Sequence, residues 1–153
     1  MVLSQPGKYA GTKKILIGET YTDNKSIAGL KGWQFREGTV ITPLDDPEMM
    51  TVDVFQKGTT YVILFSVKED TASKEFVIAD ILEIKNVVKG QEVKTGVCKE
   101  GETENVEIIG LIKPGNTEYS PVLKAWRFSR DKKRVEIKSI KNIKCLNEGF
   151  DQT

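Results

Sequence analysis

The feature that most constrains the fold is the regular alternation of short apolar segments with turn residues. Runs rich in β-branched and aromatic residues recur through the chain, and glycine, proline or asparagine separates them roughly every 8 to 12 residues. No apolar run approaches the roughly 18 residues that a membrane-spanning helix needs. The pattern predicts an all-β fold, an antiparallel sandwich or barrel of about nine to ten short strands, with room for one short helix at 26–30.

Two hairpins are the clearest elements of this pattern. The first pairs 50–56 with 59–68 around Lys57-Gly58, and the second pairs 121–128 with 135–140. Residues 75–88 fit either a helix or a strand, although their β-branched residues favour a strand with a break near Asp80. The other expected elements are a strand at 13–22, two strands within 33–42 around a Glu37-Gly38 turn, strands at 92–98, 106–113 and 142–145, and a polar loop at 99–105.

The length of the chain predicts a single domain. A chain of 153 residues lies within the usual size of one domain. Residues 1–12 contain two glycines and a proline with little periodicity, so we expect a flexible N-terminal arm. The β domain is expected to cover 13–147, and 148–153 to form a frayed tail.

The absence of histidine excludes several kinds of chemistry. The sequence has no histidine and two cysteines. Ser-His-Asp and Cys-His catalysis are therefore excluded, as are histidine-containing zinc sites and a zinc site of four cysteines within one chain. We expect no cofactor, no metal site and no enzymatic activity. The alternative is a small histidine-independent hydrolase that uses carboxylates or a Ser-Lys pair. Its best carboxylates are Asp45, Asp46, Glu48 and Asp53.

The two cysteines allow two interpretations. Cys98 and Cys145 each end a predicted strand beside a lysine, and they lie 47 positions apart. A disulfide between them would indicate a periplasmic or extracellular protein. Two free thiols, buried as small apolar side chains, are the other interpretation.

The C-terminal third resembles a pattern seen in small exported proteins of Gram-negative bacteria. The resemblance rests on Cys98, on VEIIGLIK at 106–113, on PVLKAWRF at 121–128, and on Cys145 with the Leu-Asn-Glu that follows. It implies an envelope protein made with a leader, in which Cys98 and Cys145 are bonded. It implies no activity. The leader is absent from this sequence, so a periplasmic or secreted location is an expectation and a cytoplasmic one is its alternative.

Positive charge is concentrated in the second hairpin. The net charge of the whole chain is +1, but residues 124–144 contain nine basic and two acidic residues, which leaves +7. The sharper interpretation is a face that binds a protein or an anionic polymer; the plainer one is a solvated face whose bases meet the acidic residues near them. Nucleic acid is disfavoured, because the aromatic residues do not alternate with the bases on one face. The candidate residues for anion or partner binding are Arg130, Lys132, Lys133, Arg134 and Lys138.

The sequence therefore predicts a non-enzymatic binding protein of the bacterial envelope. Trp126 could anchor a partner if it were exposed, but Trp126 and Phe128 share a strand face with Val122, which favours the core. The alternative to an envelope protein is a cytosolic inhibitor or immunity-type protein that neutralises a partner through complementary charge.

Overall fold

The protein has an all-β fold, which confirms the expected class. The structure is a computed structural model, and it describes residues 16–70 and 72–149. These residues form twelve strands, rather than nine or ten, and two 3₁₀ helices of three residues each. No helix among them is long and apolar enough to cross a membrane. The chain divides into two compact units, Met1–Asn86 (unit 1) and Val87–Thr153 (unit 2). The expectation of a single domain stays a prediction.

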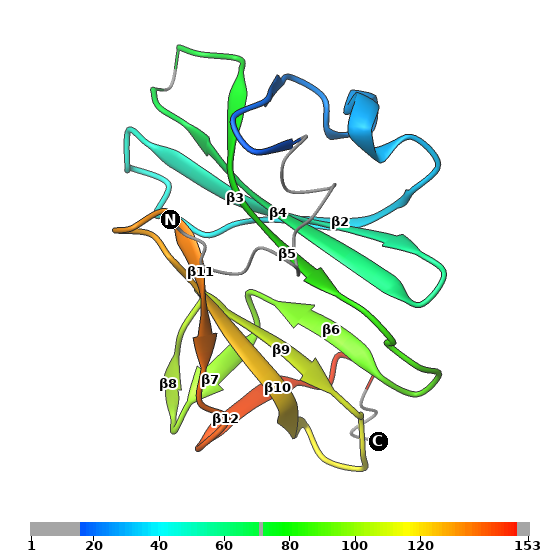
Figure 1. The fold of residues 1–153 in the computed structure, drawn as a ribbon. Coiled ribbons are helices and arrows are strands. Elements are labelled where there is room, and N and C mark those ends of the chain that lie inside the picture. The colour runs from blue at the N-terminus through cyan, green and yellow to red at the C-terminus, as the bar shows by residue number, and fades with distance from the viewer. Residues whose placement is uncertain (1–15, 71, 150–153) are drawn as a thin grey trace. The chain divides into compact units, whose positions relative to one another are not determined.

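Unit 1 is one antiparallel sheet with the strand order β1-β5-β4-β3-β2 (Figure 1). The β3–β4 hairpin forms as predicted, with Lys57 opposite Thr60. The central strand β4 is buried from Val62 to Val67, as expected of a strand that is covered on both faces. The elements are β1 (Thr20–Tyr21), η1 (Asn24–Ser26), η2 (Ala28–Leu30), β2 (Gln34–Val40), β3 (Met49–Lys57), β4 (Thr60–Lys68) and β5 (Phe76–Ile84).

The segment that precedes β2 packs on one face of this sheet. Tyr21, Ile27 between the two 3₁₀ helices and Leu30 of the second helix form a core cluster with side chains of β3, β4 and β5. Asp23 caps the first helix by accepting a hydrogen bond from the Lys25 amide at 2.9 Å. The buried members of the cluster are Leu16, Tyr21, Ile27, Leu30, Phe55, Val62, Leu64, Ile78 and Ile81.

Two expectations for the N-terminal half were wrong. The first strand covers Thr20–Tyr21 instead of 13–22, of which 13–15 lie outside the described residues. Glu37-Gly38 is not a turn, because β2 runs continuously past it with a bulge at Arg36. The glycine at 38 serves a different purpose, since a Cβ there would lie 2.5 Å from Asp53 Oδ1.

The segment 75–88, which fitted either a helix or a strand, contains the strand β5. Its β-branched residues had favoured this assignment. The strand is irregular where the break was expected. Phe65 pairs with Asp80 and Ser66 with Ile78, which leaves Ala79 as an extra, bulged residue.

Unit 2 contains a seven-stranded antiparallel sheet with the order β6-β9-β10-β12-β7-β8, and β11 pairs with β10 (Figure 1). The long strand β10 takes part in two pairings: its first residues pair with β12, and the rest pair with β9 and β11. The expected strand at 92–98 is split near Gly96, and the expected loop at 99–105 contains a tight hairpin. The strands are β6 (Glu92–Thr95), β7 (Cys98–Glu100), β8 (Thr103–Glu104), β9 (Ile108–Ile112), β10 (Tyr119–Ser129), β11 (Arg134–Lys138) and β12 (Ile143–Leu146).

Trp126 and Phe128 are buried, as the core interpretation predicted, with 7% and 0% of their surfaces exposed. The expectation that Val122 continues their face was wrong. The register of β10 shifts between Val122 and Lys124, so alternation is interrupted at Leu123, and Val122 packs in the same cluster as Ala125.

Cys98 and Cys145 form a disulfide, which confirms one of the two interpretations of the cysteines. The residues are direct cross-strand partners on β7 and β12. Both are buried in the core of unit 2 with Ile108, Ile112 and Ile143. The bond closes a long loop, because 47 positions separate the two residues.

Both termini are described only in part. The expected N-terminal arm, 1–12, lies outside the described residues, as do positions 150–153 of the expected tail. Within that tail, Glu148 forms an ion pair with Lys94 of β6 at 3.0 Å.

Candidate functional site

A buried hydrogen-bonded group lies on the covered face of the unit 1 sheet. Thr51 and Asp53 lie on β3, and Ser66 lies opposite Thr51 on β4, so alternation places all three on one face. Tyr21 of β1 reaches them from the covering segment. Its hydroxyl lies 3.0 Å from Asp53 Oδ2 and 2.8 Å from Ser66 Oγ. A phenol has one proton, so Tyr21 donates to the carboxylate and accepts from the Ser66 hydroxyl.

Burial governs the ionisation of this group. Asp53 is 6% exposed and Tyr21 is 9% exposed. Loss of hydration raises the pKa of the Tyr21 phenol well above its usual range, so the phenol stays protonated. Burial likewise raises the pKa of Asp53 above its ordinary value of 3.8, against the opposing effect of hydrogen bonds from Tyr21 and Asn24. The Thr51 hydroxyl is also buried, and it makes no hydrogen bond of normal geometry with the described residues.

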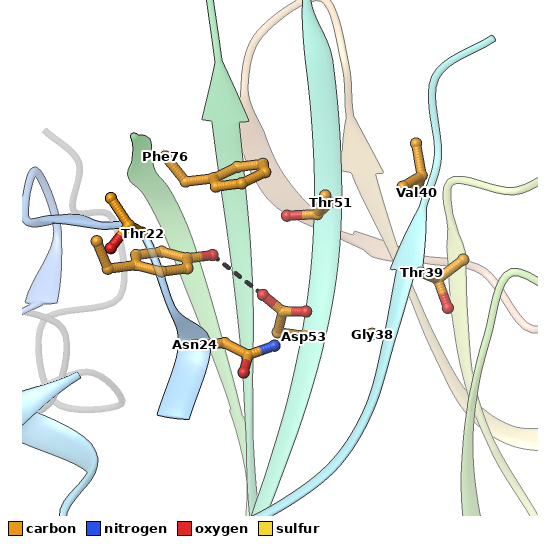
Figure 2. Close-up of a pocket in the computed structure, with 9 residues that line it drawn as sticks. Thr22, Asn24, Gly38, Thr39, Val40, Thr51, Asp53 and Phe76 are labelled. Carbon is orange, nitrogen blue, oxygen red and sulfur yellow. Dashed lines mark hydrogen bonds between the residues drawn. The ribbon is translucent and has the colours of Figure 1, made fainter. Parts of the chain in front are cut away.

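A pocket of about 220 Å³ opens beside Asp53. Figure 2 shows the Asp53 carboxylate between Asn24 on one side and Gly38 on the other. The Tyr21 hydroxyl donates to Oδ2 of this carboxylate. The ring of Tyr21 stacks on that of Phe76, with 5.7 Å between the centroids. The pocket is lined by Tyr21, Thr22, Asn24, Gly38, Thr39, Val40, Thr51, Asp53 and Phe76.

Asn24 also lines a second pocket of unit 1, of about 370 Å³. Most residues that line this pocket are apolar. Trp33, Phe35 and Phe55 provide aromatic rings, and Lys25 is the one charged side chain among the described lining residues. The two pockets therefore differ in chemistry: one contains a buried carboxylate and the other contains aromatic surface.

We expect the Asp53→Asn variant to gain stability relative to the wild type as the pH rises. The folded state holds the Asp53 proton more tightly than the unfolded state, because its pKa is raised. That contribution to stability is present below pH 3.8 and is lost as the pH rises through the folded-state pKa. Raising the pKa of a carboxyl group by one unit on folding costs about 1.4 kcal/mol of stability at neutral pH.

Urea unfolding of both proteins at about pH 4 and at neutral pH measures this difference. Asp45→Asn is the matched control, since Asp45 is an exposed acid of the same unit that lies outside the pocket. A stability difference for Asp53→Asn that does not grow between the two pH values would contradict the expectation.

The predicted basic residues of the second hairpin lie beside acidic ones. Lys132 and Arg134 both contact Glu136, at 3.2 and 3.7 Å, and Lys138 contacts Glu100 at 2.7 Å. Lys133 occupies the turn with a positive φ of 53°. These contacts are the arrangement described by the plainer interpretation, and anion or partner binding at the hairpin stays a prediction.

Arg130 has the most buried acidic partner of this set. The side chain of Glu107 is 7% exposed, and its two oxygens accept from Nε of Arg127 and Nε of Arg130, each at 2.8 Å. Glu107 also accepts from the Arg130 backbone amide at 2.9 Å. These hydrogen bonds outweigh the cost of burial and lower the pKa of Glu107. Glu107 thus holds the start of the turn in place, and its single negative charge is shared between two arginines.

The candidate carboxylates of the hydrolase alternative do not gather in one place. Asp45 and Asp46 are exposed, whereas Asp53 is buried on β3. Asp53 is the one carboxylate among the described residues that line the 220 Å³ pocket. No group of three or more potential metal ligands occurs among the described histidine, cysteine and acidic residues.

Asp53 could be identified from the sequence as a candidate carboxylate, but its hydrogen-bond partners could not. An acid within the apolar strand MMTVDVFQ was a detectable signal, because a charge on a buried strand face requires partners. Tyr21 gave no comparable signal, since it lies 32 positions away in an ordinary strand-like segment. The function of the site must be inferred from its own chemistry: comparison with protein-family models, curated proteins and solved structures found no match to this chain.

Proposed function

We propose that the protein is a non-enzymatic binding protein of the bacterial envelope that holds a small molecule in the Asp53 pocket. The observation that carries the proposal is the open pocket with a buried, hydrogen-bonded carboxylate at its wall. Pockets that combine apolar surface with a few fixed polar groups are the usual form of small-molecule sites. The volume of about 220 Å³ suits a ligand smaller than most drug molecules.

The chemistry of the pocket supports binding over catalysis. The Tyr21 phenol stays protonated and cannot act as a base at neutral pH. Ser66 is fully buried and hydrogen-bonded to Tyr21, and the nearby Lys68 of the same strand lies over the Phe76 ring. A pair of carboxylates, as glycoside hydrolysis needs, is not found among the described lining residues.

The envelope location is supported by the disulfide and by the resemblance of the C-terminal third. Disulfides persist in secreted and periplasmic proteins and are rare in the cytosol. Acid quenching of intact producing cells, followed by alkylation of thiols in the unfolded, unreduced protein, tests the location. We expect Cys98 and Cys145 to be unreactive, and free thiols at both would favour the cytosolic alternative.

Nuclear magnetic resonance of the labelled protein tests the binding function. Mixtures of small amines, polyols, sugars and amino acids are added, and we expect shifts in the amide signals of Thr39 and Thr51. Asp53→Asn is expected to change this response, and Asp45→Asn to preserve it. If no compound shifts the signals of the lining residues, the proposed function is wrong.

A further inference from the structure

Asp53 is a buried acid without a charged partner among the described residues. The Tyr21 phenol, a neutral group, donates to it, and the Asn24 amide beside it in the pocket is also neutral. Buried carboxylates are normally paired with a cation, because the loss of hydration is otherwise uncompensated. The site therefore lacks a positive charge beside Asp53, and a cationic ligand could supply that charge.

Two buried charges of unit 2 show the usual arrangement. Lys94 is 8% exposed and lies 2.8 Å from Glu92 and 3.0 Å from Glu148. Glu107 is bonded to two arginines. Asp53 differs from both in having an adjacent pocket instead of a cationic side chain within the described part of the chain.

Oδ1 is the carboxylate oxygen of Asp53 on the Gly38 side of the pocket. Tyr21 occupies Oδ2. Oδ1 lies 2.5 Å from the place where a Cβ of residue 38 would be, so any side chain at Gly38 would cover it. Gly38 is exposed and lines the pocket, and it leaves an approach to Oδ1 (Figure 2).

The remaining polar groups of the pocket suit a hydrogen-bond donor. Thr22, Thr39 and Thr51 supply hydroxyl oxygens that accept from N–H groups, and the described lining residues include no lysine or arginine. Phe76 adds little attraction for a cation, because Lys68 Nζ already lies 5.5 Å from its ring centroid. Recognition would therefore depend on the carboxylate.

We infer that the pocket binds a small organic cation through its ammonium group, with Asp53 Oδ1 as the counter-ion. This inference rests on the proposed function and names its ligand class. Binding a cation restores the charge pairing that the described residues do not provide at Asp53. The second pocket has Lys25 and no carboxylate among its described lining residues, so it offers no ion pair to the same ligand.

Calorimetric titration with two matched probes tests the inference. 1,4-Diaminobutane carries ammonium groups, and 1,4-butanediol has the same carbon chain with neutral hydroxyls. We expect the diamine to bind more tightly than the diol by about tenfold or more, because only the diamine forms an ion pair with Asp53. Asp53→Asn should lose this preference, and Asp45→Asn should keep it.

Two further measurements keep the test decisive. Binding of the diamine requires ionised Asp53. Its affinity for the wild-type protein should therefore fall as the pH is lowered through the Asp53 pKa, and this measurement needs no variant. A titration with potassium chloride asks whether an inorganic cation is the occupant, and potassium binding as tight as the diamine would overturn the organic ligand. Binding of the diol without preference for the diamine would overturn the inference but leave the proposed function standing. If the magnetic resonance test with compound mixtures also finds no ligand for the pocket, both the inference and the proposed function are wrong.

Discussion

Replacing both Cys98 and Cys145 with alanine is expected to lower the free energy of unfolding of unit 2 by about 4 kcal/mol. The disulfide joins residues 47 positions apart, and its loss returns the entropy of that loop to the unfolded chain. Both sulfurs are buried, at 2% and 0% exposure, so small voids add to the loss. Domains of this size unfold with about 5 to 15 kcal/mol, which makes the expected change a large share of the total.

Urea unfolding followed by tryptophan fluorescence measures this change. Trp33 lies in unit 1 and Trp126 in unit 2, so a Trp33→Phe background makes the signal report on unit 2. Dithiothreitol should shift the midpoint of the protein with both cysteines and leave that of the double-alanine protein unchanged. Equal midpoints with and without the bond would contradict the expectation.

The same transitions bear on the prediction of a single domain. If both units unfold as one cooperative structure, Trp33 and Trp126 report coincident midpoints in the otherwise unchanged protein. Loss of the disulfide would then shift both signals together. Separate midpoints would show that the unit with the higher midpoint stays folded after the other has unfolded.

The regular strands could be predicted from the sequence, and the irregular ones could not. The β3–β4 hairpin and the β10–β11 hairpin follow directly from alternation and turn residues. Bulges at Arg36, Ala79 and Leu123 interrupt that alternation, because an added residue changes which face the next side chain occupies. The prediction that Val122 shares a strand face with Trp126 and Phe128 was wrong for this reason.

The interpretation of the charged hairpin depended on contacts that local sequence does not contain. The run of bases and the nearby Glu136 are evident in the sequence, but two other acidic partners come from far along the chain: Glu107 lies 20 positions from Arg127, and Glu100 lies 38 positions from Lys138. The pocket is a similar case, because Tyr21 and Asp53 meet only when β1 has paired with β5 in the folded sheet. Gly38 was interpreted as a turn residue, although close approach to Asp53 explains it better.

Gly110 is the second position where a small change is expected to have a large effect. A Cβ at this residue of β9 would lie 2.5 Å from Cys145 Sγ and 2.8 Å from Val122 Cγ1. Both atoms belong to buried residues of the unit 2 core. Gly110→Ala is therefore expected to lower the free energy of unfolding by about 1 to 3 kcal/mol or more, since a packed core accepts an added methyl group only by moving.

Gly115→Ala is the matched control for this substitution, since nothing lies within 4 Å of a Cβ at Gly115. Urea unfolding of the two variants, again followed at Trp126, compares them directly. We expect Gly115→Ala to change stability by less than about 0.5 kcal/mol, as surface substitutions usually do. Equal effects of the two substitutions would show that crowding at Gly110 is unimportant.

A double-mutant cycle shows whether the disulfide itself is what Gly110 accommodates. In the protein with alanine at 98 and 145, the sulfur nearest to the added methyl group is absent and only the contact with Val122 remains. Gly110→Ala should then cost less than in the protein with the bond, and we expect a coupling free energy of about 1 kcal/mol. An unchanged cost would assign the crowding to Val122 alone. Reduced cost would mean that the glycine of β9 and the cysteines of β7 and β12 act as one unit, in which the absence of a side chain makes room for a covalent bond.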